Sequence, residues 1–336
     1  TVPSLHVGGW FDIFAGETAA SYTAMRDGAG TAQARNGQRL IIGPWDHLSY
    51  TGTYLDRQFG LAADILGVDL TSAHIAFFDR ALRGRTNALD GTAPVRLFVM
   101  GIDQWRDEQD WPLPDTEYTD YFLSSSGRAN TADGNGTLSP TGPGPDLHDT
   151  IVYDPADPVP SLGGRVIAPS ALNAVGPVDQ RPVEQRQDVL CFTTTALTDS
   201  VEVTGHLSLV LHVASSAVDT DFTGKLVDVF PDGRAIYLTD GILRLRYRDS
   251  LAEPELLEPD RVYEVTVDLA ATANVFLPGH RIRLEVSSSN FPRYDRNTNT
   301  GGVIADESLD QAVVATNRVL RGTEHPSRLV LPITNR

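Results

Sequence analysis

Cysteine is almost absent from this sequence: Cys191 is the only one among 336 residues. A single cysteine excludes an intrachain disulfide and any zinc site built from several thiolates. Cys191 follows Val189 and Leu190 in a strand-like stretch, which favours a small buried side chain over a nucleophile. The histidines are scattered, and residues 219–224 resemble the start of a calcium loop that lacks its downstream acid. We therefore expect no metal ion and no cofactor.

Basic side chains are scarce as well. The chain has 27 lysines and arginines against 44 acidic residues, a formal net charge of -17. This charge favours solubility and repels polyanions, so nucleic acid and anionic membrane surfaces are excluded as partners. Long apolar runs are missing too: residues 207–213 form one of the longest, whereas a membrane helix requires roughly 20 residues. A cytoplasmic protein without a membrane span is expected.

The sequence has no initial methionine. It opens at Thr1 and reaches the strand-like Leu5-His6-Val7 within a few positions. We interpret this start, inside a core strand, as the later part of a longer polypeptide whose targeting signals would lie outside the chain. An apolar fraction of 41% over 336 residues is ordinary for a packed protein with room for two domains.

Strands and helices alternate along residues 1–114. Apolar and turn patterns predict strands at residues 3–7, 39–42 and 95–100, and helices at residues 17–27 and 72–83. In the second helix, Ile75, Phe78 and Leu82 share one face, and Phe78 is expected to lie in the core. Gly84 is the expected stop of that helix. This alternation predicts an α/β sheet.

The helical pattern ends at the Trp-Pro-Leu-Pro stretch of residues 111–114. From residue 201 to residue 213, apolar side chains at alternate positions are expected to face a core, while those between them, His212 included, face water. Two apolar runs flank the Pro-Asp-Gly-Arg turn of residues 231–234, as in a β-hairpin. Residues 115–336 are therefore predicted to form an all-β domain, a β-sandwich of the jelly-roll type.

Two strand ends carry the candidate chemistry. Gly-Gly-Trp-Phe-Asp ends at Asp12, and Gly-Pro-Trp-Asp-His ends at His47. Loops at the carboxyl ends of parallel strands meet at one edge of a sheet, so Asp12 and His47 are expected to lie together there. A carboxylate that accepts the imidazole Nδ1 proton leaves Nε2 free to take a proton from a nucleophile. Two alternatives stay open: Asp12 caps the next helix while His47 is an ordinary loop residue, or Asp46 is the partner acid, although an adjacent residue usually points away.

The nucleophile itself is missing. A serine hydrolase of the α/β type places its serine in a Gly-x-Ser-x-Gly turn that precedes the acid and the histidine. No such turn occurs in these 336 residues, and Ser161 lacks the leading glycine and lies in the β region. We expect the nucleophilic serine upstream, so that this chain alone would be inactive. Phe14, two residues beyond Asp12, is expected to face the substrate.

These motifs resemble those of a known family. The segments ending at Asp12 and His47 are similar to the acid and histidine motifs of the CocE/NonD hydrolases, relatives of the Xaa-Pro dipeptidyl-peptidases. Further matching segments are residues 79–84, 95–101, 217–222, 231–233 and 287–292. The resemblance covers the whole chain. It implies the C-terminal part of an α/β-hydrolase sheet in residues 1–114 and, in residues 115–336, a jelly-roll domain like the C-terminal domain of the Xaa-Pro dipeptidyl-peptidases.

The resemblance also implies functional roles. Asp12 would be the acid and His47 the general base of a Ser-His-Asp triad. Phe14 would line the acyl pocket, and Ile167 and Ala168 fall near positions from which the β domain supplies a pocket wall, although the local sequence departs from the family pattern there. The implied activity is that of a serine carboxylester hydrolase that forms an acyl-enzyme with aromatic, benzoyl-type esters. Its expected partners are a small-molecule ester and the missing N-terminal half or a companion fragment, and a homodimer is also considered.

Two other functions remain open. The same catalytic class includes α-amino-acid ester or β-lactam acyl hydrolases and Xaa-Pro dipeptidyl-peptidases, which would need a carboxylate site for the substrate ammonium group. A function of another class is a non-catalytic carbohydrate-binding module, because jelly rolls commonly bind sugars and this chain lacks a nucleophile. A binding module has no use for an acid and a histidine on neighbouring strand ends, which favours the hydrolase.

Overall fold

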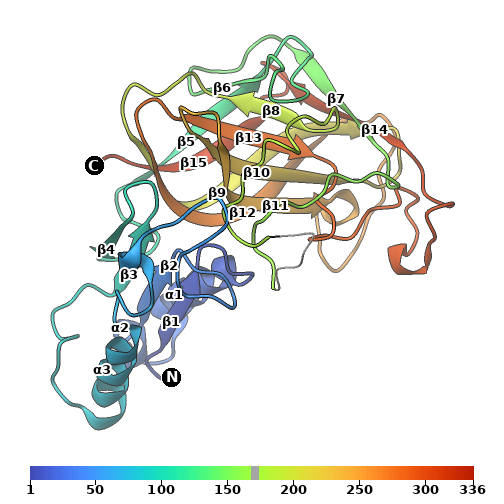
Figure 1. The fold of residues 1–336 in the computed structure, drawn as a ribbon. Helices are drawn as coiled ribbons and strands as arrows, with labels where there is room; N and C mark the ends of the chain where they lie inside the picture. Colours follow the sequence, from blue (N-terminus) through green and yellow to red (C-terminus); the bar gives the residue numbers. More distant parts are fainter. Residues whose placement is uncertain (168–173) are drawn as a thin grey trace.

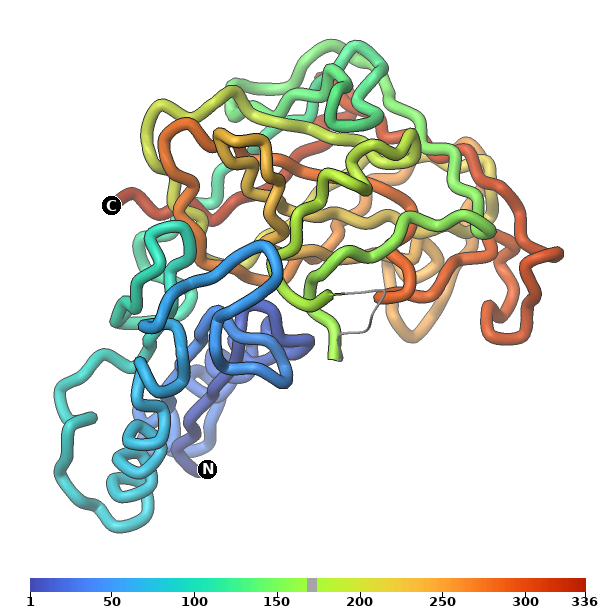
Figure 2. Tube along the Cα trace, in the orientation of Figure 1, coloured from blue at the N-terminus to red at the C-terminus, as the bar shows by residue number. Residues whose placement is uncertain are grey.

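The computed structural model describes residues 1–167 and 174–336. Figure 1 shows two parts, a smaller one in which helices flank a sheet and a larger body of strands. The chain begins in the smaller part and ends beside the larger one, as the trace in Figure 2 also shows. The fold class expected from the sequence, an α/β region followed by a β-sandwich, is confirmed.

The smaller sheet, within the described residues, has four strands in the order β1 (Leu5–Gly9), β2 (Arg39–Gly43), β3 (Val95–Val99) and β4 (Gln104–Glu108). The first three are parallel and lie close to the predicted positions, whereas β4 returns antiparallel to β3 and was not expected. In the part of the chain that the structure describes, β1 pairs only with β2. Its other edge is therefore open.

Three helices accompany this sheet in the described residues. α1 (Ala15–Gly28) and α2 (Ala32–Asn36) connect β1 to β2, and the short 3-10 turn η1 (Leu61–Ala63) and α3 (Leu70–Arg83) connect β2 to β3. α1 and α3 confirm the two predicted helices. Asp69 Oδ1 accepts a hydrogen bond from Ser72 N at 3.2 Å and caps the start of α3. Gly84 ends α3 with a left-handed φ of 64°, as predicted.

One face of α3 differs from the sequence expectation. Ile75, Phe78 and Leu82 are 60%, 51% and 78% exposed, whereas Leu70 and Phe77 are buried. The periodicity of a helix shows which apolar residues share a face, but the neighbouring elements decide which face is covered. The prediction that Phe78 lies in the core is wrong for the described chain.

The larger body contains an 11-stranded sheet within the described residues. Its strands are β5 (Thr116–Ser124), β6 (Thr137–Ser139), β7 (Leu147–Tyr153), β8 (Leu190–Thr193), β9 (Val201–Ser215), β10 (Asp221–Val229), β11 (Ala235–Arg244), β12 (Tyr263–Phe276), β13 (Arg281–Ser287), β14 (Ala315–Arg321) and β15 (Arg328–Thr334), with 3-10 turns η2 (Leu245–Tyr247) and η3 (Ile304–Asp306). The hydrogen-bonded order is β11-β10-β13-β8-β6-β5-β15-β9-β14-β7, and β12 pairs with β9. β10 and β11 form the predicted hairpin. Gly224 of β10 lies against Leu209 and Leu269 from the opposite layer, as in a sandwich.

β9 shows where the alternation of the sequence holds and where it does not. Leu207, Leu209 and their alternating neighbours are fully buried, as predicted. On the other face His206 is exposed, as predicted, but Val210 and His212 are buried, which corrects the expectation that these two face water. β12, β14 and β15 all pair with β9, and the His212 ring lies 5.4 Å from the ring of His325. Alternation identifies the two faces of a strand but not the segments that cover them.

The two parts of the molecule are joined by backbone and side-chain contacts. Met100, directly after β3, donates to Ala273 O at 2.9 Å and accepts from Val275 N at 2.8 Å. Arg106 of β4 makes a two-point ion pair with Glu202 of β9, with N–O distances of 2.8 and 2.5 Å. The division at residue 114 stays a prediction, but the two regions share an interface. Among the described residues, no helix has the length and apolar character to cross a bilayer.

Candidate active site

The ends of β1 and β2 remain paired beyond the strands themselves. Trp10 N donates to Gly43 O and Phe11 N donates to Trp45 O, both at 2.9 Å. Trp10 and Trp45 are fully buried, and Trp45 Nε1 donates to Ala63 O at 2.7 Å. The side chains that follow in each loop are therefore held at the same edge of the sheet.

Two glycines make this close approach possible. A Cβ at Gly9 would lie 2.2 Å from Trp45 O, and a Cβ at Gly43 would lie 2.4 Å from the Trp45 indole. Any larger residue at either position would push the loop that carries Trp45 away from β1. The glycines of the two sequence motifs thus bring the two loops together.

Asp12 and His47 meet at this edge. His47 Nδ1 lies 3.2 Å from Asp12 Oδ1. The Asp12 side chain is 13% exposed and the His47 side chain is 34% exposed, so the imidazole is open to solvent. Within residues 1–167 and 174–336, His47 Nε2 has no hydrogen-bond partner. If Nδ1 carries the proton, Asp12 holds the ring and Nε2 is free to act as a base.

Asp12 also contacts the start of α1. Its Oδ1 accepts a hydrogen bond from Phe14 N at 2.9 Å. The N-cap residue of α1 is Phe14, so Asp12 is not the helix cap, and the same carboxylate oxygen accepts from Phe14 N and faces His47 Nδ1. The catalytic role of the pair stays a proposal.

Asp46, the alternative partner acid, hydrogen-bonds to its own loop, whereas the Nδ1 atom of His47 contacts Asp12. It is buried, and its Oδ1 accepts hydrogen bonds from the backbone N of Leu48 and of Ser49, each at 2.8 Å. This arrangement is an Asx turn, in which an aspartate shapes its own loop. Asp46 thus orders the loop that presents His47.

Of the three residues expected to bind substrate, Phe14 lies beside His47, Ile167 is exposed, and Ala168 is not described. The ring of Phe14 lies 5.4 Å from the His47 ring, nearly perpendicular to it, and Phe14 is 52% exposed. Ile167 is 57% exposed, and Ala168 lies outside the described residues. Ser161, rejected as a nucleophile, is buried and donates through Oγ to Asn290 O at 2.8 Å.

Tyr54 is a residue of this site that the sequence interpretation missed. It is buried, its hydroxyl donates to Pro44 O at 3.0 Å, and its ring lies 5.3 Å from that of Phe11. A tyrosine in a Thr-Gly-Thr-Tyr loop carries no pattern that predicts such a position. Only the fold brings it between the two motifs.

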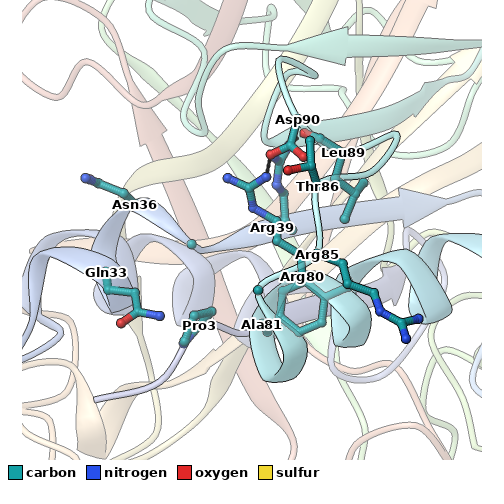
Figure 3. A pocket seen from close by; sticks show the side chains of 13 residues that line it. Pro3, Gln33, Asn36, Arg39, Arg80, Ala81, Arg85, Thr86, Leu89 and Asp90 are labelled. Carbon is teal, nitrogen blue, oxygen red and sulfur yellow. Dashed lines mark hydrogen bonds and ion pairs between the residues drawn. The ribbon is translucent and has the colours of Figure 1, made fainter.

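A separate hollow of about 430 Å³ lies between α2, the end of α3 and the loop that follows it (Figure 3). Arg39 and Arg80 line it beside buried Phe77, and Arg80 is paired with Asp90. Arg39 donates to backbone carbonyls, including Ala93 O at 2.7 Å. The hollow contains neither member of the dyad, so its charges are used in local structure rather than in the proposed chemistry.

Comparisons with known proteins place the chain in a family. Residues 87–330 match the family described as the X-Pro dipeptidyl-peptidase C-terminal non-catalytic domain. The chain belongs to this family. It is also 58% identical over 334 residues to cocaine esterase from Rhodococcus sp. (strain MB1 Bresler), an alignment that covers 99% of this chain and 57% of that protein. These matches confirm the resemblance to the CocE/NonD hydrolases.

Solved structures agree with this assignment. An aminopeptidase from the marine sediment archaeon Thaumarchaeota archaeon superposes with a TM-score of 0.84 at 30% identity, over 100% of this chain and 55% of that one. An α-amino acid ester hydrolase gives a TM-score of 0.82 at 29% identity, over 99% of this chain and 56% of that one. This chain thus spans a little over half the length of the relatives it matches and corresponds to their C-terminal part. The activities in these names belong to those longer proteins.

Proposed function

We propose that this chain is part of a serine carboxylester hydrolase and supplies the acid and the general base of its triad. The contact of 3.2 Å between His47 Nδ1 and Asp12 Oδ1 carries the proposal. The 58% identity with cocaine esterase supports ester hydrolysis as the reaction. The nucleophilic serine would come from the preceding part of the same protein or from a companion fragment, since Ser161 is buried in the sandwich.

In the proposed reaction, the serine hydroxyl attacks the ester carbonyl while His47 Nε2 takes its proton. Asp12 accepts the hydrogen bond from Nδ1 and stabilises the imidazolium. The bond from the carbonyl carbon to the alcohol oxygen then breaks, and the imidazolium returns its proton to the departing alcohol. Water, deprotonated by the same imidazole, attacks the acyl-enzyme, and the serine recovers its proton as the carboxylic acid leaves. Both halves of the reaction require an accessible Nε2.

The open edge of β1 is the proposed docking position for the nucleophile-bearing segment. β1 is paired with β2 on one side, and on its other side no strand of the described residues 1–167 and 174–336 pairs with it. A parallel strand added there would bring the loop at its carboxyl end to the sheet edge that holds Asp12 and His47. The expected N-terminal half or companion fragment would complete the site in this way.

The proposed substrate is an ester with an aromatic acyl group. Phe14 supports this substrate class, because an aromatic acyl group whose carbonyl lies near His47 would contact the exposed Phe14 ring. Ile167 and Ala168 keep their proposed place in the pocket wall. The TM-score of 0.82 with an α-amino acid ester hydrolase supports a second class, α-amino-acid esters, which would require a carboxylate near the substrate ammonium group.

Hydrolysis of a benzoyl ester by a protein that joins this chain to its nucleophile-bearing segment tests the proposal. His47→Ala and Asp12→Asn should each lower kcat by about 10⁴-fold, because the first removes the base and the second its orienting acceptor. His206→Ala is the matched control: His206 Nε2 lies 2.9 Å from Asp268 Oδ1 on the sandwich surface, so the change removes a histidine–aspartate pair from a remote position. Unchanged kcat in His47→Ala would rule the proposal out.

The preference between benzoyl and aminoacyl esters separates the two substrate classes. A ratio of kcat/KM values that favours the benzoyl ester supports the first class, and the opposite ratio supports the second. Calorimetric binding of sugars without any ester hydrolysis would instead support the carbohydrate-binding module.

A further inference from the structure

Tyr54 occupies the point where the loop of His47 and the loop of Asp12 meet. Its side chain is buried, and its hydroxyl donates to Pro44 O at 3.0 Å. Its ring meets the ring of Phe11 edge-on, with 5.3 Å between the centroids. Pro44 lies three residues before His47, and Phe11 directly precedes Asp12. One side chain therefore contacts both loops of the proposed site.

The Tyr54 hydroxyl is a permanent hydrogen-bond donor. Burial raises the pKa of its phenol far above the ordinary value, and the negative charges of Asp46 and Asp12 raise it further. Asp46 Oδ1 in turn accepts from Leu48 N and Ser49 N at 2.8 Å each. The loop is thus held at Pro44, before His47, by the phenol, and at Leu48 and Ser49, after His47, by the Asp46 carboxylate.

The β-sandwich reaches the same tyrosine. Gly176 packs so closely on the ring that a Cβ there would lie 2.5 Å from its Cδ1 and Cε1 atoms. Gly176 and Gly164 exchange two backbone hydrogen bonds of 2.8 and 2.9 Å, which hold this segment in place. Three residues further on, Asp179 N donates to Asp56 Oδ2 at 2.9 Å. The segment around Gly176 is therefore seated directly on the loop that carries Tyr54.

We infer that Tyr54 is a positioning residue through which the β-sandwich sets the orientation of His47 toward Asp12. The inference rests on the proposed esterase function. It gives a part in triad assembly to a domain family described as non-catalytic, without adding any group to the reaction itself. Loss of the hydroxyl, or displacement of the ring by the sandwich, lets the loop shift, and a shift of about 1 Å lowers a rate by up to about 100-fold.

Two variants with matched controls isolate this role. Tyr54→Phe removes the hydroxyl and keeps the ring, and its control Tyr50→Phe removes a more exposed hydroxyl from the same loop. Gly176→Ala adds a methyl group that must displace the Tyr54 ring. Its control is Gly233→Ala, because Gly176 and Gly233 have similar φ values of 76° and 88° but nothing lies within 4 Å of a Cβ at Gly233. Backbone strain is thereby matched, and only the collision differs.

The first readout needs only this chain. The ring ¹⁵N chemical shifts of His47, assigned by their loss in His47→Gln, report whether Nδ1 carries the proton. We expect the Nδ1–H form in the wild type and in both controls, and a shift toward the Nε2–H form in Tyr54→Phe and Gly176→Ala. Thermal unfolding identifies any variant that fails to fold. If Gly176→Ala does not fold, the result for Tyr54→Phe alone tests the inference.

The second readout is kinetic, in the protein that includes the nucleophile-bearing segment. Tyr54→Phe and Gly176→Ala should lower kcat for the same benzoyl ester by about tenfold to 100-fold with KM little changed, whereas the controls keep the wild-type kcat. A wild-type His47 already in the Nε2–H form, or unchanged shifts and kcat in Tyr54→Phe, would overturn the inference. If the shifts respond as expected but the wild type hydrolyses no ester, the proposed function fails and the positioning role stands.

Discussion

At the scale of single residues, the sandwich holds two neighbouring buried carboxyl groups. Burial raises the pKa of Glu184 to about 7, the charge of Glu285 adds to the rise, and Arg283 opposes it. Arg283 Nη1 donates to Glu184 Oε2 at 2.6 Å, and Lys225 Nζ donates to Glu285 Oε2 at 3.0 Å. Among the described residues, Oε1 of each glutamate has no hydrogen-bond partner. A proton held on Glu184 would relieve the repulsion between the two groups.

This proton makes stability depend on pH. The unfolded Glu184 titrates near its ordinary pKa of 4.5 and the folded one near about 7. Its contribution is therefore complete below pH 4.5 and is lost as the pH rises through about 7, at up to about 1.4 kcal/mol per pH unit. Glu184→Gln mimics the protonated form and should remove this slope. Urea unfolding of both proteins between about pH 5 and pH 8 measures it, and parallel curves would contradict the assignment.

The sequence was informative about single residues where a motif repeats a known chemistry. The segments ending at Asp12 and His47 predict that these two residues meet, and the contact of 3.2 Å agrees in geometry. Tyr54 and Glu184 could not be predicted, since their importance comes from partners far away in the sequence. Nothing in a local pattern shows that Gly176 will pack on Tyr54, because only the seating of the sandwich creates that contact.

At the scale of secondary-structure elements, α3 ends at a position whose left-handed backbone conformation favours glycine. Gly84 has a φ of 64° and nothing within 4 Å of a Cβ, so the cost of Gly84→Ala is conformational rather than steric. We expect this variant to destabilise the protein by about 1 kcal/mol. The control is Gly28→Ala at the end of α1, which also has nothing within 4 Å but no positive φ, and should be neutral or slightly stabilising. Equal unfolding midpoints for the two variants would contradict the argument.

Elements were predictable where their ends carry turn or cap residues, and unpredictable where contacts define them. Gly84 marks the end of α3, and the Pro-Asp-Gly-Arg turn marks the hairpin of β10 and β11. β4 was missed because its sequence, Gln-Trp-Arg-Asp-Glu, has no apolar alternation and forms a strand only by pairing with β3. Phe78 was expected in the core because the pattern of α3 is amphipathic. In the described structure Phe78 is 51% exposed, because no described element covers that face of the helix.

At the scale of the whole molecule, the sequence pattern changes near residues 111–114 from alternating helices and strands to strands alone. This change indicates two regions but does not show how they are joined. Met100 and Arg106 contribute to the junction, by backbone hydrogen bonds to β12 and by the ion pair with Glu202, beside the contacts of Gly176 and Asp179 with the loop of Tyr54. Glu202 is buried, so its pairing matters more than that of a surface charge. Such long-range pairs leave no local pattern in the sequence, which is why the interface could not be predicted.

Loss of this ion pair should uncouple the two regions. Arg106→Met leaves the buried Glu202 carboxylate with only Thr204 Oγ1, which donates at 2.8 Å, and should cost about 3 kcal/mol. The tryptophans, at positions 10, 45, 105 and 111, all lie in the first part of the chain, so their fluorescence follows that part while circular dichroism follows the whole. We expect coincident urea transitions in the wild type and an earlier fluorescence transition in Arg106→Met.

Arg96→Met is the control. It removes an exposed ion pair with Asp107 inside the small sheet, should cost less than about 1 kcal/mol, and should keep the two transitions coincident. Coincident transitions in Arg106→Met despite a large loss of stability would contradict this role of the ion pair and would show that the other contacts between the two regions are enough to couple them.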